Sequence, residues 1–355
     1  MNTFIYNAYA ARVVFGAGSL KHLEREIDAL GYRRALVLST PEQRDSAEMV
    51  AALLGPRAAG VFDRAAMHVP IETAREAREV AQRLGADCAV AIGGGSTTGL
   101  GKAIALDSGL PIIAIPTTYA GSEMTPVYGI TEGGMKKTGK DARVVPRAVI
   151  YDPELTLSLP AAMSLTSGIN AIAHSAEGLY SADRNSVIDF MARDGIAALG
   201  RALPVICKNP QDMQARTDAF YGAWLCGIVM GSVGMALHHK LCHTLGGTFN
   251  LPHAETHTAV LPHALAYNAP AAPEAMAKIA QALGGKSGIS GPAAVFDLAR
   301  DNGAAVALRD LGLKEADLDK ACDIAVQNQY PNPRPLDRVA LRQRLQNAWE
   351  GVRPE

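Results

Sequence analysis

The chain has 355 residues, of which 48% are hydrophobic and 19% charged, and its formal net charge is −1. This length suits two domains of ordinary size, with enough apolar residues for a core in each. The balanced charge argues against the basic surface of a nucleic-acid-binding protein and against a polybasic run that binds membranes.

Several features point to the cytoplasm. Residues 1–10 lack the charged and apolar regions of a signal peptide, and no apolar run reaches the length of a transmembrane helix. The cysteines are scattered and odd in number, which favours free thiols in a reducing compartment. They are Cys88, Cys207, Cys226, Cys242 and Cys322. We therefore expect a cytoplasmic protein with no membrane or nucleic-acid partner.

The first 150 residues alternate between short β-branched runs and helical patterns. The expected strands cover 12–15, 35–38, 59–62, 88–92, 112–115 and 148–151. The expected helices cover 20–30, 45–54, 71–84 and 98–106. Strands that alternate with helices indicate βαβ units, and near-continuous apolar strands indicate a mostly parallel sheet covered on both faces.

Helical patterns dominate after Asp152-Pro153. The expected helices of this part cover 161–181, 187–203, 212–245, 274–283, 292–301 and 315–326. The sequence thus predicts an α/β plus all-α protein. A Rossmann-like dinucleotide-binding domain covers 1–158, and an α-helical substrate or catalytic domain covers 159–355.

A glycine-rich segment, Gly-Gly-Gly-Ser at 93–96, follows the expected strand 88–92 and precedes a helix expected near Thr98. Glycines let the backbone approach a ligand, and the free N–H groups of a helix N-terminus favour phosphate. The segment is not the GxGxxG fingerprint, because position 98 is Thr. It is not a Walker loop either, because Ala103 replaces the hydroxyl that would hold magnesium. A tight turn without a ligand remains an alternative.

A second polar loop, Pro-Thr-Thr-Tyr-Ala-Gly-Ser-Glu at 116–123, follows the expected strand 112–115. Open α/β sheets bind ligands at the carboxyl ends of their strands. Two such loops together predict a cofactor cleft.

The end of the expected strand 35–38 bears on the choice of cofactor. An acidic residue there typically bonds the ribose 2′-OH of NAD and repels the 2′-phosphate of NADP. Here Ser39 and Thr40 follow, and no acidic residue comes before Glu42. We expect both NADH and NADPH to be used.

The chain has nine histidines, of which seven lie between residues 174 and 263. His239 and His243 are four apart and share a helical face, as do Asn170 and His174. Neutral imidazole is a common metal ligand, but a catalytic divalent site often includes a carboxylate as well. The amide of Asn170 is neutral and should weaken such binding. Taken singly, His238, His257 and His263 are expected to be core residues.

These motifs, together with Asp-Pro-Glu-Leu at 152–155, resemble the iron-containing alcohol dehydrogenase family over nearly the whole chain. In that family an Asp and three His hold the metal. The matching positions are Asn170, His174, His239 and His253. A further family histidine, near the nicotinamide, matches His243.

The sequence departs from the family pattern at three places, and there it resembles the metal-independent branch of that family, the maleylacetate reductases. Asn170 and Gly99 stand where the family has Asp, and the threonine-rich loop is one residue shorter. The segment Tyr-Pro-Asn-Pro-Arg-Pro at 330–335 fits the same branch. The resemblance implies reduction of the C=C bond of maleylacetate to 3-oxoadipate by NADH or NADPH, in bacterial degradation of aromatic compounds. It implies a homodimer without a metal ion.

The absence of a metal agrees with that chemistry. A simple alcohol or aldehyde needs a Lewis acid to polarise its C–O bond. An enone already spreads incoming charge onto its ketone oxygen, which hydrogen-bond donors or cationic imidazoles can stabilise.

The resemblance also implies roles for single residues. His174, His239 and His253 form a polar catalytic pocket, and His243 is the expected proton donor. Asn170 and Arg334 contact the dicarboxylate substrate, although Arg334 could equally be a surface residue of a proline-rich loop. The expected cofactor-binding residues are Thr40, Gly94, Gly95, Ser96, Thr117, Thr118, Ser122 and Lys137, with Lys136 as an alternative to Lys137.

Three other functions remain open. The first is an iron- or zinc-dependent alcohol dehydrogenase that tolerates Asn170. The second is a sugar-phosphate cyclase of the dehydroquinate synthase type, a lyase of the same architecture. It would need a metal and a Lys/Arg-rich phosphate pocket, whereas the segment 238–263 contains only Lys240. The third is a non-enzymatic nucleotide sensor, which would not need the histidines.

Overall fold

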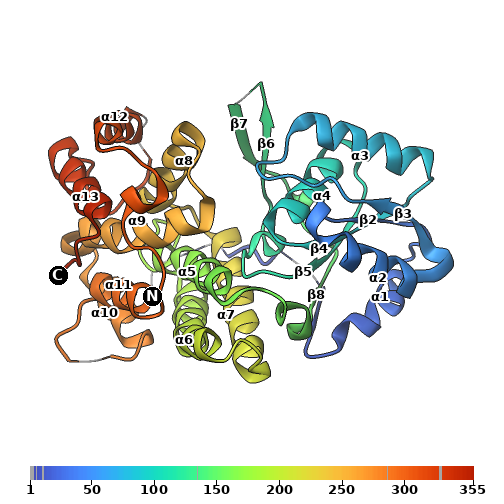
Figure 1. The fold of residues 1–355 in the computed structure, drawn as a ribbon, viewed down its shortest axis with the longest axis horizontal. Coiled ribbons are helices and arrows are strands. Elements are labelled where there is room, and N and C mark those ends of the chain that lie inside the picture. Colours follow the sequence, from blue (N-terminus) through green and yellow to red (C-terminus); the bar gives the residue numbers. More distant parts are fainter. Residues whose placement is uncertain (1–3, 5, 10–11, 134, 286, 328–329) are drawn as a thin grey trace. The chain divides into compact units, whose positions relative to one another are not determined.

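The computed structural model describes all residues except 1–3, 5, 10–11, 134, 286 and 328–329. The chain forms two compact units. One is Ala8–Leu159. The other is Pro160–Glu355 together with the described residues of the segment Met1–Asn7 (Figure 1). The sequence had predicted domains of 1–158 and 159–355, and it did not separate the N-terminal segment from the α/β unit.

The α/β unit contains a six-stranded sheet in the order β1-β8-β5-β4-β2-β3, and every pairing in it is parallel. Its strands are β1 Arg12–Phe15, β2 Ala35–Leu38, β3 Ala58–Phe62, β4 Cys88–Gly93, β5 Ile112–Pro116 and β8 Ala148–Tyr151. The expected strands agree with these bounds to within one residue at each end. The apolar β-branched runs marked them well, because a strand covered on both faces reads as a continuous hydrophobic segment.

Helices cover both faces of this sheet. They are α1 Leu23–Ala29, α2 Arg44–Leu54, α3 Ile71–Arg83 and α4 Gly95–Ser108. Short 3-10 turns cover Ser19–His22, Pro41–Gln43, Gly55–Arg57, Ser122–Met124, Ala142–Val144 and Pro153–Thr156. Successive strand residues face opposite sides. Leu36 and Leu38 therefore pack with α3 and α4, while Ala35 and Val37 pack with α1 and α2.

An antiparallel hairpin of β6 Val127–Glu132 and β7 Met135–Lys140 lies outside this sheet. The sequence did not predict it, because its polar residues give no strand-like alternation. Thr131 anchors the hairpin by donating a hydrogen bond from Oγ1 to the carbonyl of His68, at 2.8 Å.

The second unit is helical. Its helices are α5 Ala161–Gly178, α6 Ser186–Lys208, α7 Met213–Ser232, α8 Leu237–Phe249, α9 His253–Asn268, α10 Pro273–Ala282, α11 Gly291–Asp301, α12 Leu318–Gln327 and α13 Arg338–Glu350. Short 3-10 turns cover Ala269–Ala271, Leu308–Leu311 and Glu315–Asp317. The helices expected from the sequence did not include α9 and α13.

The prediction of one helix over 212–245 was wrong. The chain bends by 95° between α7 and α8. The bend is held from outside the segment: Asp183 accepts the backbone N–H of Gly234, and Glu177 accepts those of Ala236 and His238. Within the described residues no single helix is both long and apolar enough to cross a bilayer, and only the bent pair of α7 and α8 reaches the required length and composition.

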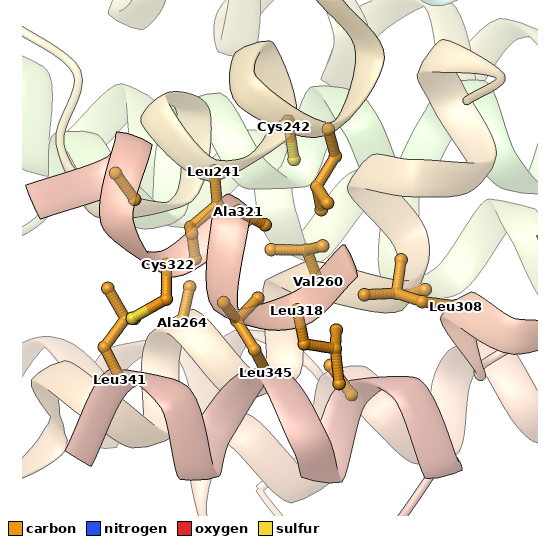
Figure 2. Packing of buried hydrophobic residues seen from close by; sticks show 14 of the residues in the cluster. Leu241, Cys242, Val260, Ala264, Leu308, Leu318, Ala321, Cys322, Leu341 and Leu345 are labelled. Carbon is orange, nitrogen blue, oxygen red and sulfur yellow. The ribbon is translucent and has the colours of Figure 1, made fainter. Parts of the chain in front are cut away.

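An apolar cluster fixes the helices that carry most of the histidines. Leu241 of α8 and Val260 of α9 pack against Leu318 of α12 and against Leu341 and Leu345 of α13 (Figure 2). Core side chains packed in this way hold α8 and α9 in one arrangement.

Candidate active site

The two polar loops of the α/β unit lie side by side. Gly93, at the end of β4, pairs with Pro116, at the end of β5. The backbone N–H of Thr117 donates to the carbonyl of Gly93 at 3.0 Å. A Cβ added to Gly94 would lie 3.1 Å from Oγ1 of Thr118, so only glycine fits here without moving its neighbour.

Helix α4 begins at Gly95 rather than near Thr98, so the glycine segment itself forms the first turn. Gly94 is the N-cap residue, and no side chain caps this end. The first backbone N–H groups of the helix, at Gly95 and Ser96, are therefore available for an anionic ligand. Oγ1 of Thr97 is buried beneath them without a partner among the described residues.

Thr40 lies at the neighbouring strand end, after β2. The side chain of Gln43 links this end to the loop after β5 by donating from Nε2 to Oγ1 of Thr117 at 2.8 Å. Thr40, the glycine segment and Thr117 thus follow the adjacent strands β2, β4 and β5 at one edge of the sheet. Sequence reasoning missed Gln43, because its partner is distant in the chain.

Ser122 belongs to a segment that a buried lysine holds against α4. Lys102 is fully buried, and its Nζ donates to the carbonyls of Ser122, Thr125 and Val127 at 2.6, 2.9 and 2.7 Å. Burial lowers the pKa of Lys102 to about 7, and the charge of Glu123 opposes this shift. The ammonium positions the loop after β5, a role that the sequence did not indicate.

Lys137 lies on β7 with two-thirds of its side chain exposed, and its Nζ lies 2.8 Å from Oε2 of Glu132. Its predicted contact with the cofactor ribose stays a prediction, and the side chain of Lys136 lies outside the described residues. Gly99 has a packing role: an added Cβ would lie 2.7 Å from Cγ2 of Val69. A family-type Asp at this position would collide with that side chain.

These features fit a dinucleotide. The unit offers a glycine cradle that a Cβ would fill and an uncapped helix N-terminus for a pyrophosphate. Hydroxyl side chains follow three adjacent strands at the edge of the sheet where open α/β folds bind nucleotides.

The helical unit gathers six histidines from α5, α8 and α9. The ring centroids of His174 and His239 are 5.1 Å apart, and those of His239 and His243 are 6.3 Å apart. The rings of His253 and His257 lie 4.4 Å apart, and those of His239 and His257 lie 5.1 Å apart. The four predicted catalytic histidines therefore belong to one cluster.

His238 and His257 were predicted to be core residues, and the structure gives them a second role. Both are buried, but they also join the cluster, with Nε2 of His238 lying 2.9 Å from Nδ1 of His257. Burial, together with the neighbouring imidazoles, holds the pKa of each well below its usual value. His263 lies apart, edge-on to Phe296.

Glu177 is the carboxylate at the base of this cluster, and sequence reasoning missed it. It is fully buried on α5, and its Oε2 lies 2.7 Å from Nδ1 of His239. It also accepts the backbone N–H groups of Ala236 and His238, at 2.9 and 2.8 Å. A signal was present, because Glu177 follows His174 by three residues and shares its helical face.

Three polar atoms of the predicted site are buried without a partner in the described part of the chain. They are Oδ1 of Asn170, Nδ1 of His174 and Nε2 of His239. Burial lowers the pKa of His174 well below its usual range, and His239 and His253 add to the effect. Such atoms need a bound polar group to satisfy them.

The four positions that match the family's metal ligands lack the carboxylate that the family has there, which should weaken their affinity for a divalent cation. They supply three imidazoles and one amide, so the ligand shell carries no negative charge. The nearest carboxylate, Glu177, is engaged by His239 and by two backbone N–H groups.

Arg334 lies in the segment 330–335, which packs against α8 and α9. Its Nη1 donates to the carbonyl of Tyr267 at 3.0 Å, and its guanidinium stacks 4.4 Å from the centre of the Tyr267 ring. Asn332 pairs with Asn268 through both amide groups. The predicted contact of Arg334 with a substrate carboxylate stays a prediction.

Comparisons with known proteins agree with this architecture. The model "Iron-containing alcohol dehydrogenase" matches residues 10–153, and "Fe-containing alcohol dehydrogenase family, C-terminal" matches residues 164–349. The chain is 65% identical over 354 residues to a maleylacetate reductase of Burkholderia cepacia, covering 100% of both chains. A second maleylacetate reductase, from Sphingobium indicum, is 54% identical over 352 residues, which cover 99% of both chains.

A solved structure is similar over the whole chain as well. The crystal structure of maleylacetate reductase from Agrobacterium tumefaciens is 53% identical, with a TM-score of 0.96 and coverage of 100% of both chains. Family models that match most of the chain, and relatives of this identity, show its membership. The chain belongs to the iron-containing alcohol dehydrogenase family and is an oxidoreductase.

Proposed function

We propose that this chain reduces the C=C bond of maleylacetate to 3-oxoadipate with NADH or NADPH, and without a metal ion. The relatives named as maleylacetate reductases support the reaction. The observation that carries the metal-free mechanism is Asn170, which stands where the family has its ligand Asp and whose Oδ1 is buried without a partner among the described residues.

The reaction is a conjugate reduction. A bound NADH or NADPH supplies a hydride to the alkene carbon β to the ketone. The C=C bond then becomes an enolate, and a proton added to the α-carbon completes the product. The protein must bind two carboxylates, stabilise the enolate oxygen and deliver that proton.

The histidine cluster can do each of these. Nε2 of His239 and Nδ1 of His174 are buried without partners, so they can serve a bound polar group. We assign His239 and His253 to the substrate carboxylates, and His174 to the enolate oxygen. Preorganised donors stabilise such a developing charge without reorganising during the reaction.

We assign the proton to His243. It follows His239 by one helical turn on α8, and its side chain is exposed rather than buried. An imidazole that keeps contact with solvent can recover its proton after each turnover. General acid catalysis by such a group contributes typically 10²–10⁴-fold.

The proposal is tested by the loss of NADH absorbance when maleylacetate is added to protein treated with chelator. We expect turnover at the rate of the untreated protein, with 3-oxoadipate as the product. Turnover of simple alcohols or aldehydes, with none of maleylacetate, would contradict it.

One observation favours a second candidate, a metal-dependent alcohol dehydrogenase. The Glu177–His239 pair resembles the carboxylate–histidine arrangement found behind metal-bound imidazoles. In that case purified protein would hold stoichiometric iron or zinc, and its removal would abolish turnover.

We further propose that the protein acts as a homodimer in the cytoplasm. The five free cysteines support a reducing compartment. Size-exclusion chromatography with light scattering tests the dimer.

A further inference from the structure

A second group of potential ligands lies behind the histidines assigned to the substrate. Within the described residues one set of three His, Cys, Asp or Glu side chains offers donor atoms within 4.8 Å of one another. It consists of His238, Cys242 and His257. None of the three was assigned to the reaction.

The fold places these side chains together. His238 and Cys242 are four residues apart on α8, so they share a helical face. His257 reaches them from α9. All three are buried, and Cys242 belongs to the apolar cluster that holds α8 and α9 together (Figure 2).

The distances suit a tetrahedral cation. Zinc bonds of about 2.05 Å to nitrogen and about 2.3 Å to sulfur require separations of about 3.3 Å between two nitrogens and about 3.6 Å between nitrogen and sulfur. Sγ of Cys242 lies 3.7 Å from Nε2 of His238. Nε2 of His238 lies 2.9 Å from Nδ1 of His257. The imidazoles must therefore separate by a few tenths of an ångström.

A buried carboxylate lies next to these side chains. Glu177 accepts the backbone N–H of His238 at 2.8 Å and is fully buried. A divalent ion with one thiolate carries one positive charge, which the buried Glu177 carboxylate can balance.

We propose that His238, Cys242 and His257 form a binding site for a thiophilic divalent cation of the zinc class, distinct from the four positions that match the family's metal ligands. Thiolate and imidazole donors select such ions over magnesium or calcium. On binding, the thiol releases its proton to solvent, and the hydrogen bond between the two histidines is replaced by two metal–nitrogen bonds.

The test is a titration of the full-length, chelator-treated protein with Co²⁺ alone. Cobalt bound to a thiolate gives a sulfur-to-metal charge-transfer band in the near ultraviolet. The positions Asn170, His174, His239 and His253 contain no sulfur and cannot produce it. We expect one equivalent of Co²⁺ to bind with this band, and Zn²⁺ to remove it by competition.

Variants locate the ligands. The band should vanish in Cys242→Ser, and Co²⁺ should bind at least tenfold more weakly to His257→Gln. Cys226→Ser is the matched control, because Cys226 is another buried thiol of this unit, 3.0 Å from Oγ of Ser175. It should keep the band.

Three results would overturn the proposal: no binding of Co²⁺ to the wild-type protein, binding without the sulfur band, or a band that persists in Cys242→Ser. Should the variants fail to fold, ¹¹³Cd NMR of the wild-type protein decides. A chemical shift typical of one sulfur and two nitrogens supports the site, and a shift typical of nitrogen and oxygen ligands excludes it. None of these measurements depends on the reductase reaction.

Discussion

Oε2 of Glu177 lies 2.7 Å from Nδ1 of His239, and the same carboxylate accepts the backbone N–H groups of Ala236 and His238. One buried side chain of α5 thus supports the first turn of α8 and orients an imidazole on that turn. Because Nδ1 is held by the carboxylate, Nε2 of His239 is the nitrogen left for a ligand.

Glu177→Ala should therefore affect folding and binding together. It leaves two buried N–H groups and one imidazole unsatisfied, at a cost of about 3 kcal/mol in the free energy of unfolding. Glu177→Gln keeps an acceptor and should fold with a smaller loss, but its KM for maleylacetate should rise about tenfold, roughly 1.4 kcal/mol. Urea denaturation and steady-state kinetics measure the two effects. An unchanged KM in Glu177→Gln would contradict the orienting role.

His243→Ala should lower kcat by about 10²–10⁴-fold while the protein still binds NADH, because the variant loses the general acid that we propose. His239→Ala and His253→Ala should raise KM more than they lower kcat, because we assign these residues to binding the substrate carboxylates. Melting temperatures recorded with the kinetics exclude a merely structural effect. A stable His243→Ala protein that turns over at the wild-type rate would contradict the assignment of His243 as the proton donor.

Activity should survive exhaustive chelation, because Asn170 leaves the family's metal positions without a carboxylate. Asn170→Asp restores the negative charge and should raise the affinity of these positions for zinc or iron. Elemental analysis after dialysis against each metal compares the two proteins. Stoichiometric metal in the wild-type protein, whose removal stops turnover, would refute metal independence. Metal bound at Cys242 would not refute metal independence, provided that turnover continues after that metal is removed.

NADH and NADPH should both be used, with kcat/KM values within about tenfold of each other, roughly 1.4 kcal/mol. The residues after β2 are Ser39 and Thr40, and neither repels a 2′-phosphate. Thr40→Asp should reduce kcat/KM for NADPH and spare that for NADH. A thousandfold preference in the wild-type protein would mean that another residue sets the choice.

The free energy of unfolding should fall as the pH is lowered from 6.5 to 4. Burial lowers the pKa of His263 to about 4 in the folded protein, with a further contribution from Arg344. Above pH 6.5 the imidazole is neutral in both the folded and the unfolded chain. As the pH falls below 6.5, the unfolded chain binds a proton that the folded protein does not yet bind, so unfolding becomes more favourable. For His263 alone the loss can reach about 3 kcal/mol.

His263→Leu removes this titration and fits the apolar neighbours Leu241, Val260 and Leu345. Its unfolding free energy should therefore change less between pH 6.5 and pH 4. The same slope in both proteins, measured by urea denaturation, would show that His263 does not contribute. His174, His238 and His257 shift in the same direction and remain in the variant.

The sequence by itself determined the local structure. The apolar runs located all six strands of the parallel sheet, and β2, β4, β5 and β8 gave a continuous apolar signal because they are buried on both faces. The fourfold spacing of His239 and His243 placed both on one face of a helix, as in α8. The glycine segment after β4 was located as well, although the helix begins three residues earlier than expected.

Only the tertiary structure decided which distant groups meet. The break between α7 and α8 depends on Glu177 and Asp183, more than fifty residues earlier in the chain. The sequence predicted His238 and His257 to be core residues, and only the packing of α8 against α9 brings their rings together. The sequence did not indicate the role of Lys102, because three of its partners are backbone carbonyls, which every residue possesses. Periodicity reports the face of one element, whereas hydrogen bonds and ligand sets form between elements, so their partners become visible only once the core has fixed those elements in space.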